Sequence, residues 1–356
     1  MDHHAVAKDW AGELTAVRHD EKTGAHFVIA VHSTRLGPAT GGTRAMVYPD
    51  VADAVVDARR LAGAMTYKTA LAGLPMGGGK SVIALPAPRA ELDSATWRRI
   101  LDVHAANLQL FNGSFWTGPD VGTESADMDV LRRSTDYVFG RSPEAGGPGS
   151  SAENTAVGVF AAVRAAAREA GCGELAGLRV LVSGLGAVGS RVAEFAREAG
   201  ARLMVADIAD DRCAPFAEQG ARLVPVDEVT TTECDLLVPC ATGGLITEQV
   251  AETVPCAAIA GAANNILGDD AAAEVLRRRG ICYAPDFVTN AGGVIHLVGR
   301  EILGWSADEV LARVQEIGQT VETIFKTAST QDISTDAAAR QLAESNLAAA
   351  PPGRVS

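Results

Sequence analysis

Two lysines and an aspartate carry the strongest chemical signal in the first third of the chain. Lys68 follows Met65-Thr66-Tyr67, and Lys80 follows the three glycines of 77–79. The first 120 residues hold only four lysines, which makes two so close together notable. If both share one pocket, each cation makes the other harder to protonate, and burial acts in the same direction. One lysine then serves as a neutral base while the other binds a carboxylate; the alternative is two ordinary surface lysines.

Asp120 follows Gly118-Pro119 and therefore lies on a turn. An aspartate there is either a local cap of the turn or an acid that relays a proton at a reacting centre, and the sequence leaves both open. Gly79-Lys80-Ser81 resembles the end of a phosphate-binding P-loop. That motif needs glycine at position 74, where this chain has leucine, so a nucleoside triphosphate site is not expected.

A second chemical signal is the motif Gly184-Leu185-Gly186-Ala187-Val188-Gly189, which matches G-x-G-x-x-G. The apolar strand of 179–182 leads into it, and a helical pattern leads out. In a dinucleotide-binding fold, Gly184 permits the tight turn, Gly186 lets the backbone approach a pyrophosphate, and Gly189 lets helix and strand pack closely. The free N–H groups at the start of the helix then face the pyrophosphate.

Asp207 ends the next apolar run, 18 residues past Gly189. Its carboxylate can accept hydrogen bonds from both ribose hydroxyls, and it repels a 2′-phosphate. Asp210 and Asp211 add to that repulsion, whereas an arginine at position 212 can bind a 2′-phosphate. The sequence therefore predicts NAD in preference to NADP.

The elements that must position these groups fall into two halves with different sequence patterns, and the two halves meet near residue 150. The pattern in the first half predicts a hairpin of strands 14–19 and 27–32, and helices over 51–65, from 94, and over 127–138. The Gly/Pro/Ser run 146–151 reads as a hinge, and a helix over 153–170 follows. Beyond it, short apolar runs alternate with helical patterns, which predicts an α/β fold with a parallel sheet covered on both faces. These runs are 180–182, 203–206, 236–238, 257–260 and 281–284.

Composition excludes several classes of function. Apolar residues make up 47% and charged residues 21%, which is typical of a globular chain and excludes disorder and coiled coil. The net charge of −13 argues against nucleic acid or an anionic membrane as partner. The six cysteines form no C-x-x-C pair, so neither a metal site nor a disulfide framework is expected. The N-terminus shows no long apolar stretch, and a cytoplasmic location is expected.

Seven motifs together resemble one enzyme family. They occur in the family's order and cover roughly residues 12–330; they are 38–44, 65–68, 75–80, 117–123, 184–189, 261–265 and 290–293. The chain resembles the glutamate/leucine/phenylalanine/valine dehydrogenases, and among them most of all the L-phenylalanine dehydrogenases of actinobacteria. The resemblance implies NAD-dependent, reversible oxidative deamination of an L-amino acid to a 2-oxo acid and ammonia.

The resemblance also assigns roles to residues. It makes Lys80 the general base that activates water, Lys68 the ligand of the substrate carboxylate, and Asp120 the proton shuttle. The other substrate-binding positions that it implies are Gly42, Met65, Gly118, Pro119, Asn264, Asn290 and Val294. The cofactor-binding positions are Ser151, Thr155, Gly184, Leu185, Gly186, Ala187, Val188, Gly189, Asp207, Ile208, Cys240, Ala241 and Asn264.

The family has a two-domain organisation. Residues 1–150 correspond to an α/β substrate domain that also mediates oligomerisation, with the C-terminal helix 330–350 as a candidate to rejoin it. Residues 151–329 correspond to a Rossmann-type, doubly wound NAD domain, with a cleft between the two. A homo-oligomer acting on small molecules is expected.

Substrate preference depends on the side-chain pocket. Gly118 resembles the aromatic-preferring members, because a missing methyl group leaves room for a ring. Val294 resembles the branched-chain members and narrows the opposite wall. We therefore expect phenylalanine as the substrate, with a branched-chain substrate, leucine or valine, as the alternative. A non-catalytic NAD-binding protein is a further alternative, against which the intact Lys80 and Asp120 argue.

Overall fold

The computed structural model describes residues 10–350, which fall into two compact units. Within the described residues, unit 1 comprises residues up to 149, 297–304 and those from 343 onward; unit 2 comprises 150–296 and 305–342. The sequence assigned 297–304 to the NAD domain, whereas the structure places this segment in unit 1. Of helix 330–350, the candidate to rejoin the substrate domain, the described residues from 343 onward belong to unit 1 and the earlier ones to unit 2. Segment 297–304 joins unit 1 because Glu301 accepts hydrogen bonds from the Gly140 N–H and, at 2.8 Å, from Arg141 Nε.

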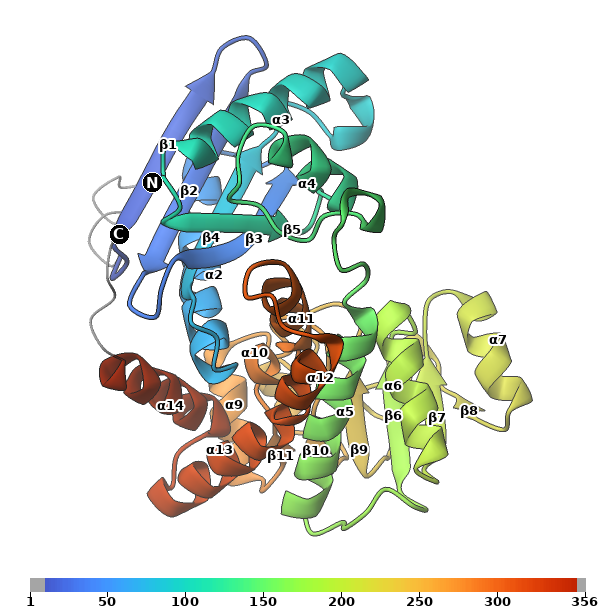
Figure 1. Cartoon of the computed structure of the whole chain (residues 1–356). Coiled ribbons are helices and arrows are strands. Elements are labelled where there is room, and N and C mark those ends of the chain that lie inside the picture. The colour runs from blue at the N-terminus through green and yellow to red at the C-terminus, as the bar shows by residue number, and fades with distance from the viewer. Residues whose placement is uncertain (1–9, 351–356) are drawn as a thin grey trace. The chain divides into compact units, whose positions relative to one another are not determined.

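Unit 1 is built on a mixed five-stranded sheet (Figure 1). The strand order is β1-β2-β4-β3-β5; β1, β2 and β4 are antiparallel neighbours, and β3 is parallel to both β4 and β5. The strands are β1 (Leu14–Asp20), β2 (Ala25–Ser33), β3 (Ala39–Met46), β4 (Gly77–Ala84) and β5 (Phe115–Pro119). The predicted hairpin is confirmed as β1 and β2.

Helices cover both faces of this sheet. They are α2 (Val51–Leu71), η1 (Arg89–Glu91), α3 (Ser94–Gln109), α4 (Ser125–Arg132) and η2 (Pro143–Ala145). Helix α2 packs on one face through small buried residues such as Ala54, Ala58 and Ala62, and Asp50 caps its N-terminus by accepting from the Ala52 N–H. Helix α3 covers the other face through Trp97 and its neighbours. The predicted starts of α2 and α3 are confirmed.

In unit 1, three strands and one helix end were not predicted. Strands β3 and β4 are rich in glycine, which normally weakens a strand, and β5 ends in Gly118-Pro119, so their pattern is not typical of a strand. The helix predicted over 127–138 ends at Arg132. Beyond it the chain turns back, and Val138 forms a parallel bridge with Thr117 of β5, so this segment extends the sheet edge instead.

Unit 2 contains a wholly parallel six-stranded sheet with the order β11-β10-β9-β6-β7-β8. Read from β8, this is the order 3-2-1-4-5-6 of a doubly wound dinucleotide-binding fold. The strands are β6 (Arg179–Ser183), β7 (Arg202–Ala206), β8 (Arg222–Leu223), β9 (Leu236–Pro239), β10 (Ala258–Ile259) and β11 (Cys282–Tyr283). The predicted α/β class is confirmed.

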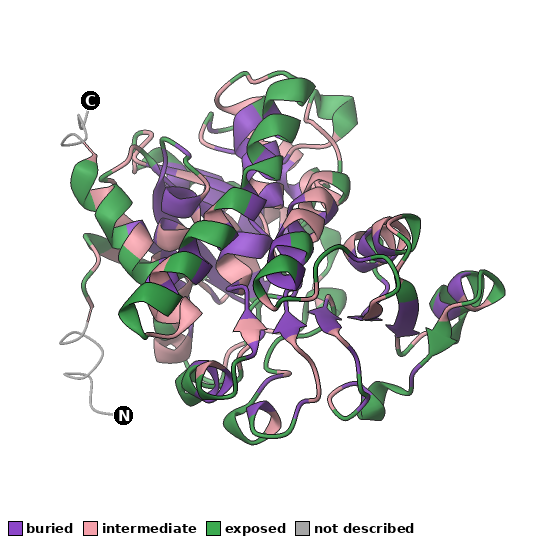
Figure 2. Cartoon of the chain, turned by 90° about the horizontal axis from the view of Figure 1, so that it is seen from below, coloured by how far each residue is buried: buried purple, intermediate pink, exposed green. Residues whose placement is uncertain are grey.

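Most helices that accompany this sheet combine buried and exposed residues, which are purple and green in Figure 2. They are α5 (Ala152–Glu169), α6 (Ala187–Glu198), α7 (Asp210–Glu218), η3 (Val226–Glu228), α8 (Glu248–Ala251), α9 (Asp270–Arg278), α10 (Asp286–Thr289), α12 (Ala307–Gln315) and α13 (Ile317–Gln331). Two further helices, α11 (Gly292–Glu301) and α14 (Thr335–Ala349), contribute residues to both units. Helix α6 begins inside the glycine motif, earlier than the predicted start near Arg191.

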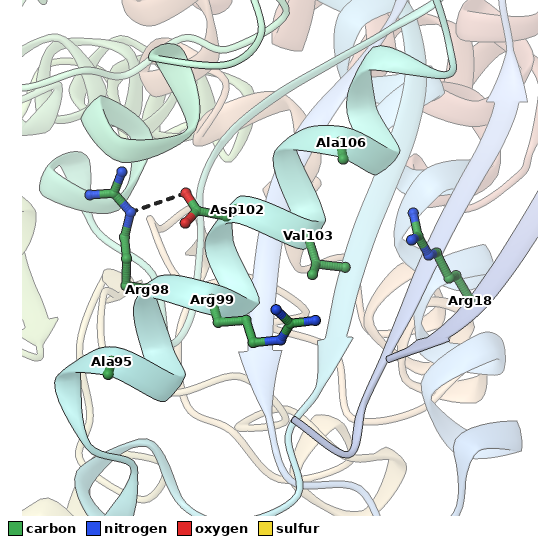
Figure 3. A pocket seen from close by; sticks show the side chains of 7 residues that line it. All are labelled: Arg18, Ala95, Arg98, Arg99, Asp102, Val103 and Ala106. Carbon is green, nitrogen blue, oxygen red and sulfur yellow. Dashed lines mark hydrogen bonds and ion pairs between the residues drawn. The ribbon is translucent and has the colours of Figure 1, made fainter. Parts of the chain in front are cut away.

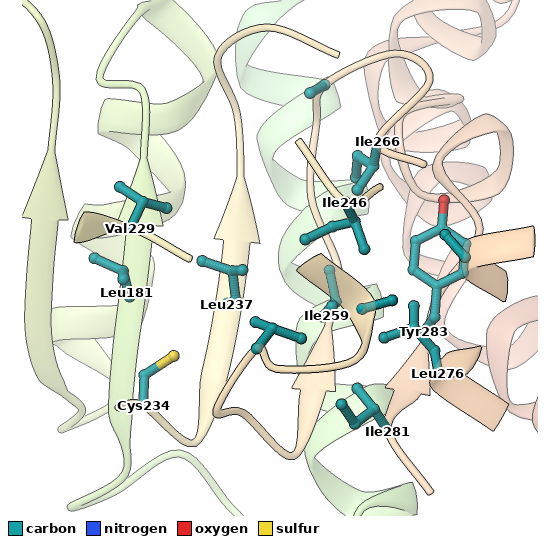
Figure 4. Close-up of a cluster of buried hydrophobic side chains, with 14 of the residues drawn as sticks. Leu181, Val229, Cys234, Leu237, Ile246, Ile259, Ile266, Leu276, Ile281 and Tyr283 are labelled. Atoms are coloured by element: carbon teal, nitrogen blue, oxygen red, sulfur yellow. The ribbon is translucent and has the colours of Figure 1, made fainter. Parts of the chain in front are cut away.

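The core of unit 2 contains near-continuous apolar strands, as expected for a sheet covered on both faces. Leu181, Leu237 and Ile259 come from three adjacent strands and point into one cluster with Ile246 and Tyr283 (Figure 4). Among the helices of residues 10–350, none combines the length and apolar character needed to cross a bilayer.

Candidate functional site

Lys80 and Asp120 form a buried ion pair in unit 1. Lys80 lies in β4 with only 6% of its surface exposed, and its Nζ donates to Asp120 Oδ2 at the carboxyl end of β5. Strand β3 lies between β4 and β5, and glycine at position 42 of β3 leaves room for the Asp120 side chain beside it. The structure therefore brings together the two residues that the sequence singled out as base and proton shuttle.

The electrostatics of this pair are unusual for a lysine. Burial lowers the pKa of Lys80, and the net shift stays downward even though Asp120 opposes it; the cation of Arg44 also lowers it. Burial acts to raise the pKa of Asp120, but Lys80 and Arg44 outweigh this effect and hold that pKa below its usual value. A lysine that loses its proton easily is suited to general base catalysis.

Arg44 and its partners complete the charge cluster, and the sequence reading assigned them no role. Arg44 Nε lies 3.6 Å from Asp120 Oδ2, and its Nη1 donates to Asp57 Oδ2 at 2.9 Å. Asp57 also accepts from the Tyr48 hydroxyl at 2.8 Å and from Arg60 at 2.9 Å. Because side chains alternate between the two faces of a strand, Arg44 lies on the same face of β3 as Gly42. The two-residue spacing from Gly42 could therefore have identified Arg44 from the sequence.

The glycines around Lys80 serve the packing of the protein itself. A Cβ at Gly78 would lie 2.1 Å from the backbone nitrogen of Thr66, so only glycine lets α2 lie this close to β4. A Cβ at Gly42 would lie 2.7 Å from Cβ of Asp120. The sequence indicated that something approaches the glycine backbone closely, and at Gly78 it is helix α2.

The expected space at Gly118 is filled. A Cβ there would lie 2.3 Å from Cε2 of Phe139, a residue that is only 4% exposed. The prediction that the missing methyl group leaves room for a substrate ring is therefore wrong in its simple form. Glycine at position 118 lets the Phe139 ring lie against β5, so any effect on a substrate acts through Phe139.

Lys68, Met65 and Pro119 lie on the elements around this pair. Lys68 is in the last turn of α2 and Met65 one turn earlier, and α2 packs on the face of the sheet that contains Gly78. Pro119 ends β5 opposite Thr43 of β3. That Lys68 shares a pocket with Lys80 stays a prediction.

A neutral polar layer supports the opposite face of the same strands. Thr43, Ser81 and Thr117 come from β3, β4 and β5, and the Thr43 hydroxyl lies 2.7 Å from each of the other two. Nε2 of the fully buried His104 lies 3.1 Å from the Thr43 hydroxyl. Burial lowers the pKa of His104 to about 3, so this imidazole is neutral at ordinary pH.

The glycine motif of unit 2 forms the predicted turn between β6 and α6. Gly184 has φ +95°, and a Cβ at Gly189 would lie 1.8 Å from the carbonyl oxygen of Gly184, so both positions require glycine. Around Gly186, by contrast, a Cβ would meet nothing within 4 Å. The turn thus has open space beside the first residues of α6, namely Ala187 and Val188, where unpaired N–H groups can receive an anion.

Asp207 supports this turn from the end of β7. Its Oδ2 accepts from the Leu185 N–H at 2.6 Å and its Oδ1 from the Ala209 N–H at 2.9 Å. Although burial acts to raise the pKa of Asp207, these backbone hydrogen bonds lower it overall, so the group stays ionised. Arg212 Nη1 lies 3.8 Å from Asp207 Oδ1. Ile208, the residue after Asp207, is 89% exposed.

The remaining predicted cofactor residues gather at the carboxyl ends of β9, β10 and β11. A Cβ at Gly184 would lie 2.7 Å from Cβ of Ala241, while Cys240, whose pKa burial raises to about 12, faces Gly189. The Asn290 side chain donates to Asn264 Oδ1 at 2.9 Å. Ligands bind outside the carboxyl ends of such strands, where the strand order reverses, here between β6 and β9.

Ser151, Thr155 and Val294 lie where α5 and α11 begin. A Cβ at Gly293 would lie 3.1 Å from the Thr155 hydroxyl and 3.4 Å from that of Ser151. Val294 follows in the first turn of α11, so these residues belong to one region of unit 2.

A cavity of about 460 Å³ between β1 and α3 is separate from both sets of residues (Figure 3). Its arginines already have partners: Arg99 binds Asp20, Arg98 binds Asp102, and Arg18 donates to an asparagine. None of the predicted site residues lines it.

Comparison with known proteins identifies the family. The model described as Glu/Leu/Phe/Val dehydrogenase, dimerisation domain, matches residues 15–137. The model described as Glutamate/Leucine/Phenylalanine/Valine dehydrogenase matches residues 146–220 and 205–352. The chain belongs to the glutamate/leucine/phenylalanine/valine dehydrogenase family. The predicted resemblance to this family is thereby confirmed, and the protein is an amino-acid dehydrogenase of this family.

Relatives in this family differ in their substrates. The chain is 40% identical over 330 residues to a leucine dehydrogenase of Geobacillus stearothermophilus, with 92% of this chain and 88% of the relative covered. It is 37% identical over 334 residues to a phenylalanine dehydrogenase of Thermoactinomyces intermedius, covering 93% and 89%. The solved L-tryptophan dehydrogenase of Nostoc punctiforme has a TM-score of 0.84 at 31% identity, covering 97% and 98%. Family members depend on NAD(P), which confirms the expected nicotinamide cofactor.

Proposed function

We propose that this amino-acid dehydrogenase catalyses the reversible oxidative deamination of L-phenylalanine to phenylpyruvate and ammonia with NAD. The observation that carries the proposal is the buried pair of Lys80 and Asp120, because desolvation favours the neutral amine that a general base needs. The glycine turn of unit 2 supplies a matching dinucleotide site at the reversal of strand order.

In this proposal the lysines and Asp120 divide the chemistry. Lys68 binds the substrate carboxylate with help from the Gly42 backbone, and Asp120 takes up and returns the proton of the substrate amine. Neutral Lys80 then accepts a proton from the water that attacks the imino carbon, so that the C–N bond breaks and ammonia leaves. Met65, Pro119 and Val294 contact the substrate side chain, Gly118 acts on it through Phe139, and positioning of Cα is the main contribution of the protein.

The residues of unit 2 fit a nicotinamide dinucleotide. The open space beside Gly186 and the N-terminus of α6 suit a pyrophosphate, and the ionised Asp207 disfavours a 2′-phosphate. When bound, the cofactor accepts a hydride. Ser151, Thr155, Cys240, Ala241, Asn264, Asn290 and Ile208 line its site in this proposal, and NAD is preferred over NADP.

Leucine is the second candidate substrate. The higher identity to a leucine dehydrogenase favours it, as does Val294, which resembles the branched-chain members. Phenylalanine rests on the resemblance of Gly118 to the aromatic-preferring members. Because the Phe139 ring lies beside this glycine, any effect of Gly118 on the substrate acts through Phe139. A rate profile over all amino acids at alkaline pH decides: a higher kcat/KM for leucine than for phenylalanine contradicts the phenylalanine assignment.

The catalytic assignment is tested with Lys80→Ala. This variant should lose about 10²–10⁴-fold in turnover, which is the usual contribution of general base catalysis. Its affinity for NADH, measured by fluorescence titration, should stay within twofold of the wild type, since Lys80 belongs to unit 1 and the glycine turn to unit 2. Near-normal kcat in this variant would show that Lys80 is not the base.

We further propose a homo-oligomer formed through unit 1. The dimerisation-domain model covers residues 15–137, and edge strand β1 leaves Leu14 and Val17 about half exposed. An edge strand with exposed apolar side chains has one side open and is prone to pair with another chain. Light scattering after size-exclusion chromatography should give a mass of at least two chains, and a monomer would refute the proposal.

A further inference from the structure

The charge cluster around Lys80 extends one layer beyond the residues of the proposed mechanism. Arg44 stands between two carboxylates: Asp120, whose Oδ2 lies 3.6 Å from its Nε, and Asp57 of α2, which its Nη1 contacts at 2.9 Å. Nε is buried and makes no hydrogen bond within the described residues, so its contact with Asp120 is electrostatic. Arg44 therefore contributes charge to the Lys80–Asp120 pair from a fixed position.

Asp57 is what fixes that position. Its side chain is 16% exposed, and its two oxygens accept from three donors. A carboxylate held in this way stays ionised, and its pKa is lowered accordingly: burial acts to raise it, but the Tyr48, Arg60 and Arg44 contacts prevail. The guanidinium of Arg44 is thus anchored on α2 while it faces the catalytic pair.

Charge balance shows what this anchor does. With Lys80 protonated, Asp120 lies between the cations of Lys80 and Arg44, and Asp57 lies between those of Arg44 and Arg60. When Lys80 is neutral, Asp120 loses its nearest cation, and a buried carboxylate without a cation is costly. Arg44 then remains as the countercharge. The charged or titratable groups in contact within this cluster come from β3, β4, the end of β5, α2 and the β3–α2 connection: Arg44, Lys80, Asp120, Asp57, Arg60 and Tyr48.

We propose that Arg44, anchored by Asp57, is a positioning residue of the deamination reaction: it holds the Asp120 carboxylate and supplies its countercharge whenever Lys80 acts as a neutral base. This inference rests on the proposed role of Lys80. It assigns to Arg44 no contact with the substrate.

The two members of the anchor should affect the pH profile in opposite directions. Arg44→Gln removes a cation near Lys80, so the protonated amine becomes easier to form. The acidic limb of log kcat/KM for deamination should then move to higher pH by about one unit. Asp57→Asn removes an anion, so the same limb should move to lower pH. If Arg44 and Asp57 had only a structural role, both variants would lose activity, but the acidic limb would not move in opposite directions.

Three further variants separate charge from shape. Arg44→Lys keeps the cation but loses the planar double contact, so kcat should fall while the limb stays within about 0.3 unit of the wild type. Tyr48→Phe removes a neutral donor and should leave the limb in place. Arg98→Gln, at the exposed pair with Asp102 on α3, is the matched control and should change neither rate nor limb. Circular dichroism confirms folding of each variant.

A measurement without turnover distinguishes this inference from the proposed function. Competitive labelling of the apoenzyme with acetic anhydride at several pH values, read by mass spectrometry, reports the titration of Lys80 directly. Displacements of this titration in the predicted directions support the anchor even if no amino acid is deaminated, an outcome that would contradict only the proposed function. Equal titration of Lys80 in wild type, Arg44→Gln and Asp57→Asn overturns the inference.

Discussion

Replacing Gly118 by alanine tests whether the Phe139 ring occupies the space beside β5. The added Cβ would lie 2.3 Å from Cε2 of Phe139, whereas ordinary contact begins at 3.4 Å, so the ring must move by about 3.4 − 2.3 = 1.1 Å. Phe139 is only 4% exposed, and a displacement of this size in a packed region costs about 1–3 kcal/mol. The expected result is a loss of about 2–10 °C in Tm.

The same displacement should alter substrate preference if Phe139 borders the side-chain pocket. Movement of the ring away from β5 narrows the space for an aromatic substrate more than for a branched one. The ratio of kcat/KM for phenylalanine to that for leucine should then fall about tenfold, which corresponds to about 1.4 kcal/mol. Steady-state rates with both amino acids measure this ratio.

A double-mutant cycle isolates the contact. Phe139→Leu in the Gly118→Ala background should recover at least half of the lost stability, because a smaller side chain no longer meets the new methyl group. Strictly additive effects of the two substitutions would refute the proposed contact. A Gly118→Ala variant with unchanged Tm and an unchanged substrate ratio would refute the reasoning altogether.

Three further predictions concern other parts of the chain. Gly63→Ala should raise stability by up to about 1 kcal/mol in a thermal melt, since a Cβ at this position in α2 meets only His32 at 3.7 Å and alanine favours helix. His104 is neutral when folded, with a pKa of about 3 against about 6.5 unfolded, so its contribution to stability is complete above pH 6.5 and is lost as pH falls below it. Between pH 7.5 and 5.0 the wild type should lose about 2 kcal/mol more than His104→Gln in urea titrations; equal losses would contradict this. Asp207→Ser should raise the ratio of NADP to NAD activity at least about tenfold. The variant lacks the anion that repels a 2′-phosphate, whereas Arg212, whose Nη1 lies 3.8 Å from Asp207 Oδ1 in the wild type, is kept. An unchanged ratio would show that Asp207 does not select the cofactor.

Local sequence patterns were sufficient to predict features that depend on one residue type and its near neighbours in the chain. The turn at Gly184 requires a positive φ, and the motif predicted it directly. The N-cap of α2 by Asp50 and the alternation of strands and helices in unit 2 likewise follow from neighbours in sequence. The order of the seven motifs also sufficed to indicate the family.

Tertiary structure decided the contacts between residues far apart in the chain. The meeting of Lys80 with Asp120, 40 positions away, depends on β3 lying between β4 and β5, an arrangement that the glycine-rich strands concealed. The same holds for Arg44 and Asp57, and for Phe139, which fills the space that the sequence left to a substrate at Gly118. Propensity and periodicity describe each segment alone, whereas the burial that perturbs Lys80 arises only when separate strands pack together.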